Sequence, residues 1–156
     1  EKGRNMKKIR QGVFETNSSS THSLTISGSD KFIYPKFIPT IEFGEYGWEQ
    51  ETYSDFTDKI SYVITMLATV NGIQKFEDFL TLKEFGWLKE AVNQHCGQEL
   101  KIKAINDKYN PLGYVDHQSN DVLDEFLSQD ELDFKVKVLD FIFNEKYGFE
   151  TDNDNH

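Results

Sequence analysis

Eight consecutive small or polar residues, positions 16–23, separate two stretches whose side-chain pattern is typical of β-strands. The loop of a β-hairpin usually needs only about two to five residues. The run Thr-Asn-Ser-Ser-Ser-Thr-His-Ser is longer, so it is able to bring backbone N–H groups, hydroxyls and an imidazole to one ligand. It lacks the Gly-Lys-Ser/Thr of a P-loop and is not a Walker motif. The alternative is a serine-rich turn whose hydroxyls satisfy local backbone groups.

As a binding loop, this run supplies the first part of a candidate site. Its hydroxyls and amides suit a phosphate or another anion, and His22 suits general acid/base catalysis or metal ligation. The candidate ligand-binding residues are Asn17, Ser18, Ser19, Ser20, Thr21 and Ser23. The candidate catalytic residues are His22 and, from the loop segment 113–119, Asp116 and His117.

Two further polar segments are the candidates for completing that site. Asp116 and His117 are neighbours, and neighbouring side chains of an extended segment point to opposite faces, so we do not expect both at one centre. The alternative is that Asp116 helps to cap the next helix. In the acidic tail, Asp152 and Asp154 have a spacing that suits a hard cation, but the glycine and distal glutamate of an EF-hand are absent. A disordered acidic terminus is the alternative there.

A set of His22, one of Asp116 and His117, and one of the tail carboxylates would suit a divalent metal ion and phosphodiester chemistry. The sequence specifies no cofactor, and a divalent metal is the one that this set would hold. Nothing in the spacing brings the three segments together.

The pattern of apolar residues predicts a single α+β domain, with a small, mostly antiparallel sheet packed against about four helices. A chain of 156 residues suits one domain, which we expect over residues 6–156, with 1–5 as a leader or cloning remnant and about 150–156 as the acidic tail. We expect strands at 6–15, 23–27 and 100–105, and an edge strand at 147–151. We expect helices at 54–70, 76–96, 119–127 and 128–143.

Punctuating residues support the helix boundaries. Ser54 and Ser119 are the predicted N-caps of their helices, and Ser128 begins a capping box with Glu131. Asn71-Gly72 and Gly97 are predicted stops. Alternation in residues 134–138 also fits a strand, and the capping box favours the helix there.

The charge of the chain bears on its partners. Net charge is −10, and residues 119–156 contain eleven Asp or Glu against three Lys. This field repels phosphate backbones, so we expect no direct binding to duplex nucleic acid, and it suits a basic protein partner. Solubility alone is the alternative explanation. The candidate partner-binding residues are Asp121, Asp124, Glu125, Asp130, Glu131 and Asp133.

Other composition features indicate the compartment. The single cysteine, Cys96, excludes an internal disulfide and is typical of a reducing environment. No signal sequence and no apolar run of membrane-spanning length is present, so we expect a cytoplasmic protein without membrane contact. The oligomeric state is not specified.

Residues 6–24, Met-Lys-Lys-Ile-Arg-Gln-Gly-Val-Phe-Glu-Thr-Asn-Ser-Ser-Ser-Thr-His-Ser-Leu, resemble the opening of a group of small proteins from tailed phages and mobile elements of Firmicutes. Residues 113–119 and 141–144 resemble later segments of the same group. The resemblance touches both ends of the chain and brings no activity with it. It implies a setting, the bacterial cytoplasm during phage infection or prophage carriage.

Two hypotheses of function follow. In the first, an accessory phage or mobile-element protein binds and modulates a basic host protein, such as a nucleic-acid-binding defence factor, through an acidic surface that imitates phosphate charge, in an anti-CRISPR-like or host-takeover role. In the second, a small enzyme or ligand-binding protein acts on a nucleotide or phosphodiester through the serine-rich run and His22, with or without a metal. The sequence leaves open whether the protein is an enzyme.

Overall fold

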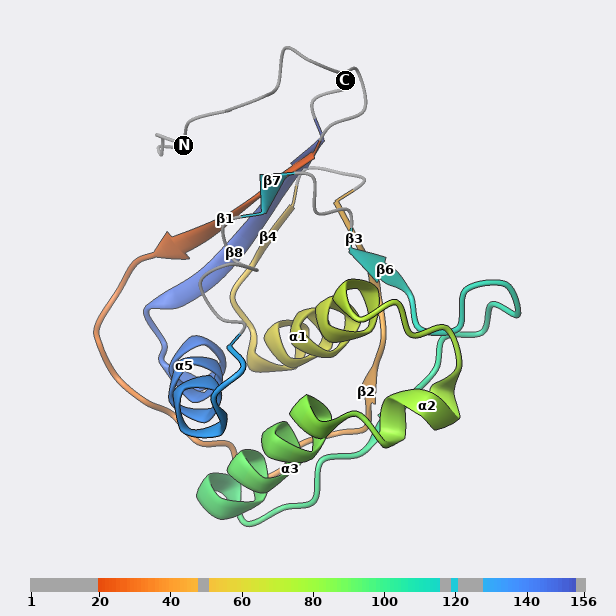
Figure 1. Ribbon diagram of the computed structural model, residues 1–156. Helices are drawn as coiled ribbons and strands as arrows, with labels where there is room; N and C mark the ends of the chain where they lie inside the picture. Colours follow the sequence, from red (N-terminus) through yellow and green to blue (C-terminus); the bar gives the residue numbers. More distant parts are fainter. Residues whose placement is uncertain (1–19, 48–50, 116–118, 121–127, 154–156) are drawn as a thin grey trace.

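The computed structural model describes residues 20–47, 51–115, 119–120 and 128–153, and these form an α+β fold (Figure 1). The main sheet has four strands in the order β4-β8-β1-β7. The strands are β1 (Ser20–Ile26), β4 (Glu51–Tyr53), β7 (Ser119–Asn120) and β8 (Tyr147–Asn153). β8 runs antiparallel to both β4 and β1, whereas β7 runs parallel to β1. The predicted fold class is confirmed.

Two of the predicted strands belong to the main sheet, with bounds or positions that differ from the prediction. The strand expected at 23–27 is present, but it begins at Ser20, because β8 offers β1 a backbone partner at every residue from Ser20 to Ile26. Residues 20–23 are therefore strand rather than loop. The strand expected at 147–151 is also present, but it extends to Asn153 and lies between β4 and β1, so the prediction of an edge strand is wrong. The strand expected at 6–15 lies outside the described residues.

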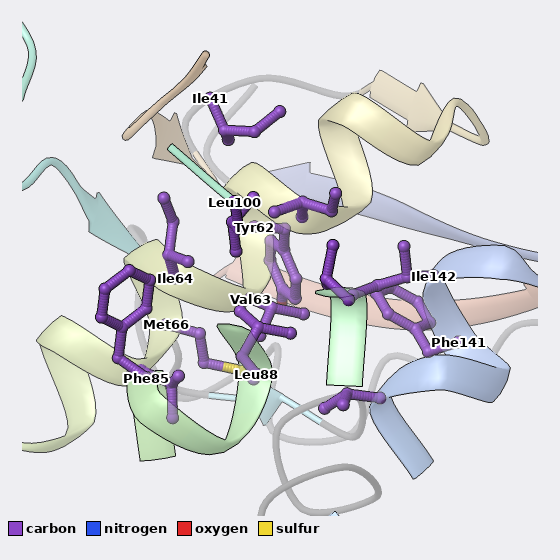
Figure 2. Close-up of a cluster of buried hydrophobic side chains, with 14 of the residues drawn as sticks. Ile41, Tyr62, Val63, Ile64, Met66, Phe85, Leu88, Leu100, Phe141 and Ile142 are labelled. Carbon is purple, nitrogen blue, oxygen red and sulfur yellow. The ribbon is translucent and has the colours of Figure 1, made fainter. Parts of the chain in front are cut away.

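The described helices pack on one side of the sheet (Figure 1). They are α1 (Phe56–Val70), α2 (Phe76–Leu80), α3 (Lys83–Cys96) and α5 (Glu131–Phe143). Every residue of α1 from Lys59 to Ala68 is buried, so α1 is the central helix of the domain. Its Tyr62 ring lies 4.1 Å from the ring of Phe149 in β8, measured between centroids. Figure 2 shows side chains of α1, α3 and α5 meeting in this core.

Two helix caps differ from those predicted. α1 begins after Asp55 rather than Ser54, and Asp55 accepts a hydrogen bond from the Thr57 hydroxyl at 2.6 Å. α5 begins after Asp130 rather than Ser128, because the Asp130 carboxylate accepts the N–H of Asp133 at 2.9 Å. The Asp130 carboxylate is thus the N-cap acceptor of α5 in place of the predicted serine, whereas the Asp55 side chain makes no capping hydrogen bond to α1. The predicted preference for helix over strand at 134–138 is confirmed.

The remaining helix predictions concern residues 76–96 and 119–127 and the predicted helix stops. The helix expected at 76–96 is divided at Thr81 and Leu82: the Leu82 backbone is extended, with ψ of 132°, and its carbonyl accepts the Gly86 N–H as α3 begins. Ser119 pairs with Thr21 in the sheet, and its predicted role as a helix cap stays a prediction. The rest of that expected helix, residues 121–127, lies outside the described residues. The predicted stops at Asn71-Gly72 and Gly97 are confirmed.

Two small parallel pairs complete the described strands. β2 (Ile41–Glu42) pairs with β5 (Ile102–Lys103), and β3 (Glu45–Tyr46) pairs with β6 (Tyr114–Val115). The strand expected at 100–105 is thus only two residues long. Within the described part of the chain, no helix has the length and apolar character needed to cross a bilayer.

A buried polar junction holds α5, β8 and the segment after β1 together. Asn144, only 1% exposed, donates from Nδ2 to Asp30 at 2.6 Å and to Asp140 at 2.9 Å, and its Oδ1 accepts the N–H groups of Lys31 and Lys146. Its side-chain donors and acceptor are therefore all used. This accounts for a buried amide at a helix end without a free polar group.

Lys59 completes this junction from α1. Its ammonium donates to the carbonyl oxygens of Tyr147 at 2.8 Å and Asn144 at 3.4 Å, and it lies 5.7 Å from the centroid of the Phe141 ring. The side chain is 2% exposed, and burial lowers the pKa of Lys59 to about 8. The cation therefore joins the central helix to the first residue of β8.

We expect Lys59→Met to cost more stability at pH 10 than at pH 7. The folded-state pKa of about 8 lies below the ordinary lysine value of 10.5, so the folded protein loses the proton first and wild-type stability rises with pH across that window. The shift in the pKa of Lys59 corresponds to a change of about 3 kcal/mol in the free energy of unfolding. Urea unfolding of both proteins at the two pH values measures it, and comparing the two proteins cancels tyrosine titration. An equal cost at both pH values would contradict this account.

A second prediction concerns Gly113, which adopts φ +64° where β6 approaches β3. The Tyr114 N–H donates to the Gly44 carbonyl at 3.0 Å, and a Cβ on Gly113 would overlap that carbonyl oxygen. Gly113→Ala should therefore cost about 2–4 kcal/mol. Gly97→Ala is the matched control, since φ there is +67° with open space around it, and should cost about 1 kcal/mol. Equal losses in urea unfolding would show that the close approach is unimportant.

Candidate functional site

Backbones from all three polar segments meet at one end of the main sheet. Thr21 in β1 has Ser119 of β7 and Asp152 of β8 as its cross-strand partners, and His22 has Asn120 and Thr151. The serine-rich run, the end of the 113–119 segment and the acidic tail are therefore adjacent. The sequence spacing did not show this. The sheet register produces it.

One cross-strand row at this end combines four polar residue types. It is made of Glu51, Thr151, His22 and Asn120, paired in that order from β4 to β7, and we call it the polar row. The row two positions along the strands is apolar, with Tyr53 stacked on Phe149 at 4.6 Å between ring centroids and Leu24 opposite Phe149. Within the polar row, Glu51 is exposed and Thr151 is 1% exposed, so the row extends from the surface into the protein interior.

Most predicted site residues are not covered by this geometry. Ser20, Thr21, His22 and Asp152 are in paired strands, and Ser23 lies opposite Glu150. The remaining predicted ligand-binding, catalytic and metal-binding residues lie outside the described part: Asn17, Ser18, Ser19, Asp116, His117 and Asp154. Among the described residues, no group of three or more His, Cys, Asp or Glu side chains is placed to hold a metal ion. The metal site stays a prediction.

An acidic cluster that the sequence did not indicate lies beside the polar row. Glu51 of β4, Asp55 before α1 and Asp58 in its first turn interact electrostatically. Burial raises the pKa of Asp58, and the charges of Asp55 and Glu51 raise it further. Within the described residues none of these three carboxylates forms a salt bridge. We call this set the acidic edge.

Two tyrosines stand behind the acidic edge. The Tyr53 hydroxyl donates to the Glu51 carboxylate, and the Tyr46 hydroxyl donates to Ser61 at 2.8 Å. Burial raises the pKa of Tyr46 to about 12 and raises that of Tyr53 as well, with Glu51 and Asp58 contributing to both. Both phenols therefore stay protonated at neutral pH. Edge-to-face packing at 5.4 Å between centroids fixes the two rings as the support for the edge.

The acidic residues predicted to bind a partner are differently placed. Asp130 caps α5, while Glu131 pairs with Lys135 at 2.7 Å and Asp133 with Lys137 at 3.3 Å. Hydrogen bonds from Ser128 and Lys137 hold the pKa of Asp133 below its usual value. These three carboxylates therefore have partners within α5: two lysine ammonium groups and a backbone N–H. Asp121, Asp124 and Glu125 lie outside the described residues.

A third surface feature is the segment that joins β1 to β2. Its exposed large apolar side chains are Ile26, Phe32, Ile33, Tyr34 and Phe37. The segment is anchored: Gln98 donates to the Pro35 carbonyl at 3.1 Å and accepts the Ile38 N–H at 2.6 Å, and Tyr34 lies against Phe143. Such clustering is typical of protein-interaction surfaces.

Comparison of this chain with protein-family models, with curated proteins and with solved structures gave no match.

Sequence reasoning missed Glu51, Asp55, Asp58 and Thr151. Asp55 and Asp58 carry a weak local signal, since acidic residues are enriched in the first turn of a helix. Glu51 and Thr151 carry none, because only the pairing of β4 with β8 brings position 51 beside position 151.

Proposed function

We propose that this protein binds a basic partner protein through the acidic edge, Glu51, Asp55 and Asp58. The observation that carries the proposal is that the charges of Asp55 and Glu51 raise the pKa of Asp58, and that none of the three carboxylates forms a salt bridge within the described residues. Bringing a Lys or Arg of another protein to them would relieve that repulsion.

The position of the acidic edge supports the same function. β4 is an outer strand of the described sheet, and Glu51 and Asp55 are exposed. The net charge of −10 adds a long-range field that would accelerate the approach of a basic protein. The resemblance of residues 6–24 to phage and mobile-element proteins suggests the setting: the partner would be a bacterial host protein with a basic nucleic-acid groove, such as a defence factor.

Removing the three charges should weaken such binding about tenfold, since three exposed ion pairs of about 0.5 kcal/mol each sum to about 1.5 kcal/mol. The test is a quantitative pull-down from Firmicutes lysate at low salt with a triple variant, Glu51→Gln, Asp55→Asn and Asp58→Asn. Recovered proteins should also be lost at high salt.

The matched control carries Asp130→Asn, Glu131→Gln and Asp133→Asn, which changes net charge equally at residues that are answered within α5. Circular dichroism checks that both triple variants fold. The proposal fails if the two triple variants lose binding equally, or if the wild-type protein recovers nothing at low salt.

A second function is favoured by one observation, the meeting of the polar segments around His22. In this alternative the protein binds or hydrolyses a nucleotide or phosphodiester, with the serine-rich run holding the phosphate and His22 acting on it. The divalent metal of the sequence prediction belongs to this alternative.

For this alternative we expect His22→Ala and Ser19→Ala each to abolish ligand binding or activity without a large loss of stability. Nucleotide binding by calorimetry and hydrolysis of bis-p-nitrophenyl phosphate, with and without Mg²⁺ or Mn²⁺, provide the measurements. Thr25→Ala, in the same strand but away from the polar row, is the control. Unchanged behaviour of both variants would exclude the alternative.

A further inference from the structure

A small pocket lies at the opposite end of α1 from the acidic edge. Its volume is about 140 Å³, and its walls come from the end of α1, from α3 and from the residues before α5. The lining residues are Leu67, Val70, Asn71, Glu84, Ser128 and Gln129. The N- and C-terminal ends of α1 are about 22 Å apart, given about 1.5 Å per residue over its 15 residues. The pocket is therefore separate from the proposed partner-binding edge and does not depend on it.

The central observation is the state of Glu84. Its residue is 7% exposed, and it lines the pocket. Within the described part of the chain its carboxylate has neither a hydrogen bond nor a salt bridge, although buried glutamates are almost always paired. Glu84 lies in the first turn of α3, where the helix dipole favours its charge, but a dipole does not supply the missing donors.

The other walls add negative potential. α1 ends at this pocket, and its last turn contains no basic side chain to answer the negative end of the helix dipole. Asn71 uses its Nδ2 to donate to the Leu67 carbonyl at 2.8 Å, which leaves its Oδ1 as an acceptor. The pocket thus gathers a carboxylate, an amide oxygen and a helix C-terminus.

We propose that this pocket binds the guanidinium group of an arginine side chain or of a small guanidino compound. A cavity of about 150 Å³ holds a molecule the size of benzene, so a planar guanidinium with its first methylenes fits in 140 Å³. Guanidinium supplies several donors in one plane, and Leu67 and Val70 give its carbon stem an apolar wall. A divalent metal is disfavoured, since only one carboxylate lines the pocket.

The experiment titrates the full-length protein with methylguanidine, with agmatine and with a short blocked peptide containing one arginine. Amide NMR shifts and calorimetry report binding. Saturable binding should move the amide signals around Glu84 and Asn71, and it should weaken at least tenfold in Glu84→Gln. The matched control is Glu77→Gln, which removes the same charge from an exposed position in α2 and should bind like wild type.

A second variant keeps the test independent of any folding effect at Glu84. Val70→Phe narrows the pocket from a position that is already 42% exposed, and its control, Leu80→Phe, enlarges a side chain in α2 that is 49% exposed. Val70→Phe should abolish binding, and Leu80→Phe should not affect it.

The arms also identify the source of the guanidinium. Binding of methylguanidine and agmatine assigns the pocket to small guanidino compounds, whereas binding of the peptide alone assigns it to the arginine of a protein. Absence of saturable binding by all three probes, or an equal loss in Glu84→Gln and Glu77→Gln, overturns the proposal. Loss of binding in the acidic-edge triple variant would not be expected, so the two sites fail separately.

Discussion

The junction of Asn144 and Lys59 is the interaction on which the rest of the described structure depends. Asn144 ends α5 and holds residues 30 and 31 beside it, while Lys59 fastens the first residue of β8 to the central helix. β8 in turn carries β1 and β4 on its two sides, so its starting point sets the register of both. Because the group at the centre is an amide with every donor and acceptor used, the junction admits one geometry, which an apolar contact would not enforce.

The sequence predicted those helices, helix stops and strands whose formation depends on neighbouring residues. The apolar face of α1, the stops at Asn71-Gly72 and Gly97, the helix over α5 and the strand around residues 23–27 were all readable, because each follows from periodicity or capping within one turn or one strand. The sequence could not show that Ser119 pairs with Thr21 or that β8 lies between two partners. Those outcomes come from competition between distant segments for the same backbone hydrogen bonds, and a cap or an alternation pattern carries no information about it.

The candidate sites also differ in whether the local sequence indicates them. The serine-rich run was visible because it exceeds the length of a turn, and the register now places its last residues beside the other two polar segments. Glu51 and Glu84 were invisible, since nothing near either residue distinguishes it from a solvated glutamate. What makes each distinctive is an environment that the tertiary structure builds: Asp55 and Asp58 of the following turn and helix beside Glu51, and the end of α1 with Ser128 beside Glu84. Glu131 and Asp133, which the sequence indicated as partner-binding residues, form salt bridges with lysines of their own helix, α5.

The burial and dipole of α1 explain the positions of the two carboxylate sites, the acidic edge and the pocket at Glu84. Its body is buried, so charge reaches this helix only at its ends or, as with Lys59, at the cost of burial. At the N-terminal end, Asp55 and Asp58 match the positive pole of the dipole, which stabilises the helix while Glu51 adds repulsion. At the C-terminal end the pole is negative and Glu84 has the same sign, so of these two charges only Glu84 has an offsetting pole, that of α3. At the acidic edge, water and dissolved cations screen the charges of the exposed Glu51 and Asp55. At the second site the Glu84 residue is only 7% exposed, so water satisfies its carboxylate poorly, and a cation that enters the pocket would supply the partner that the described residues do not.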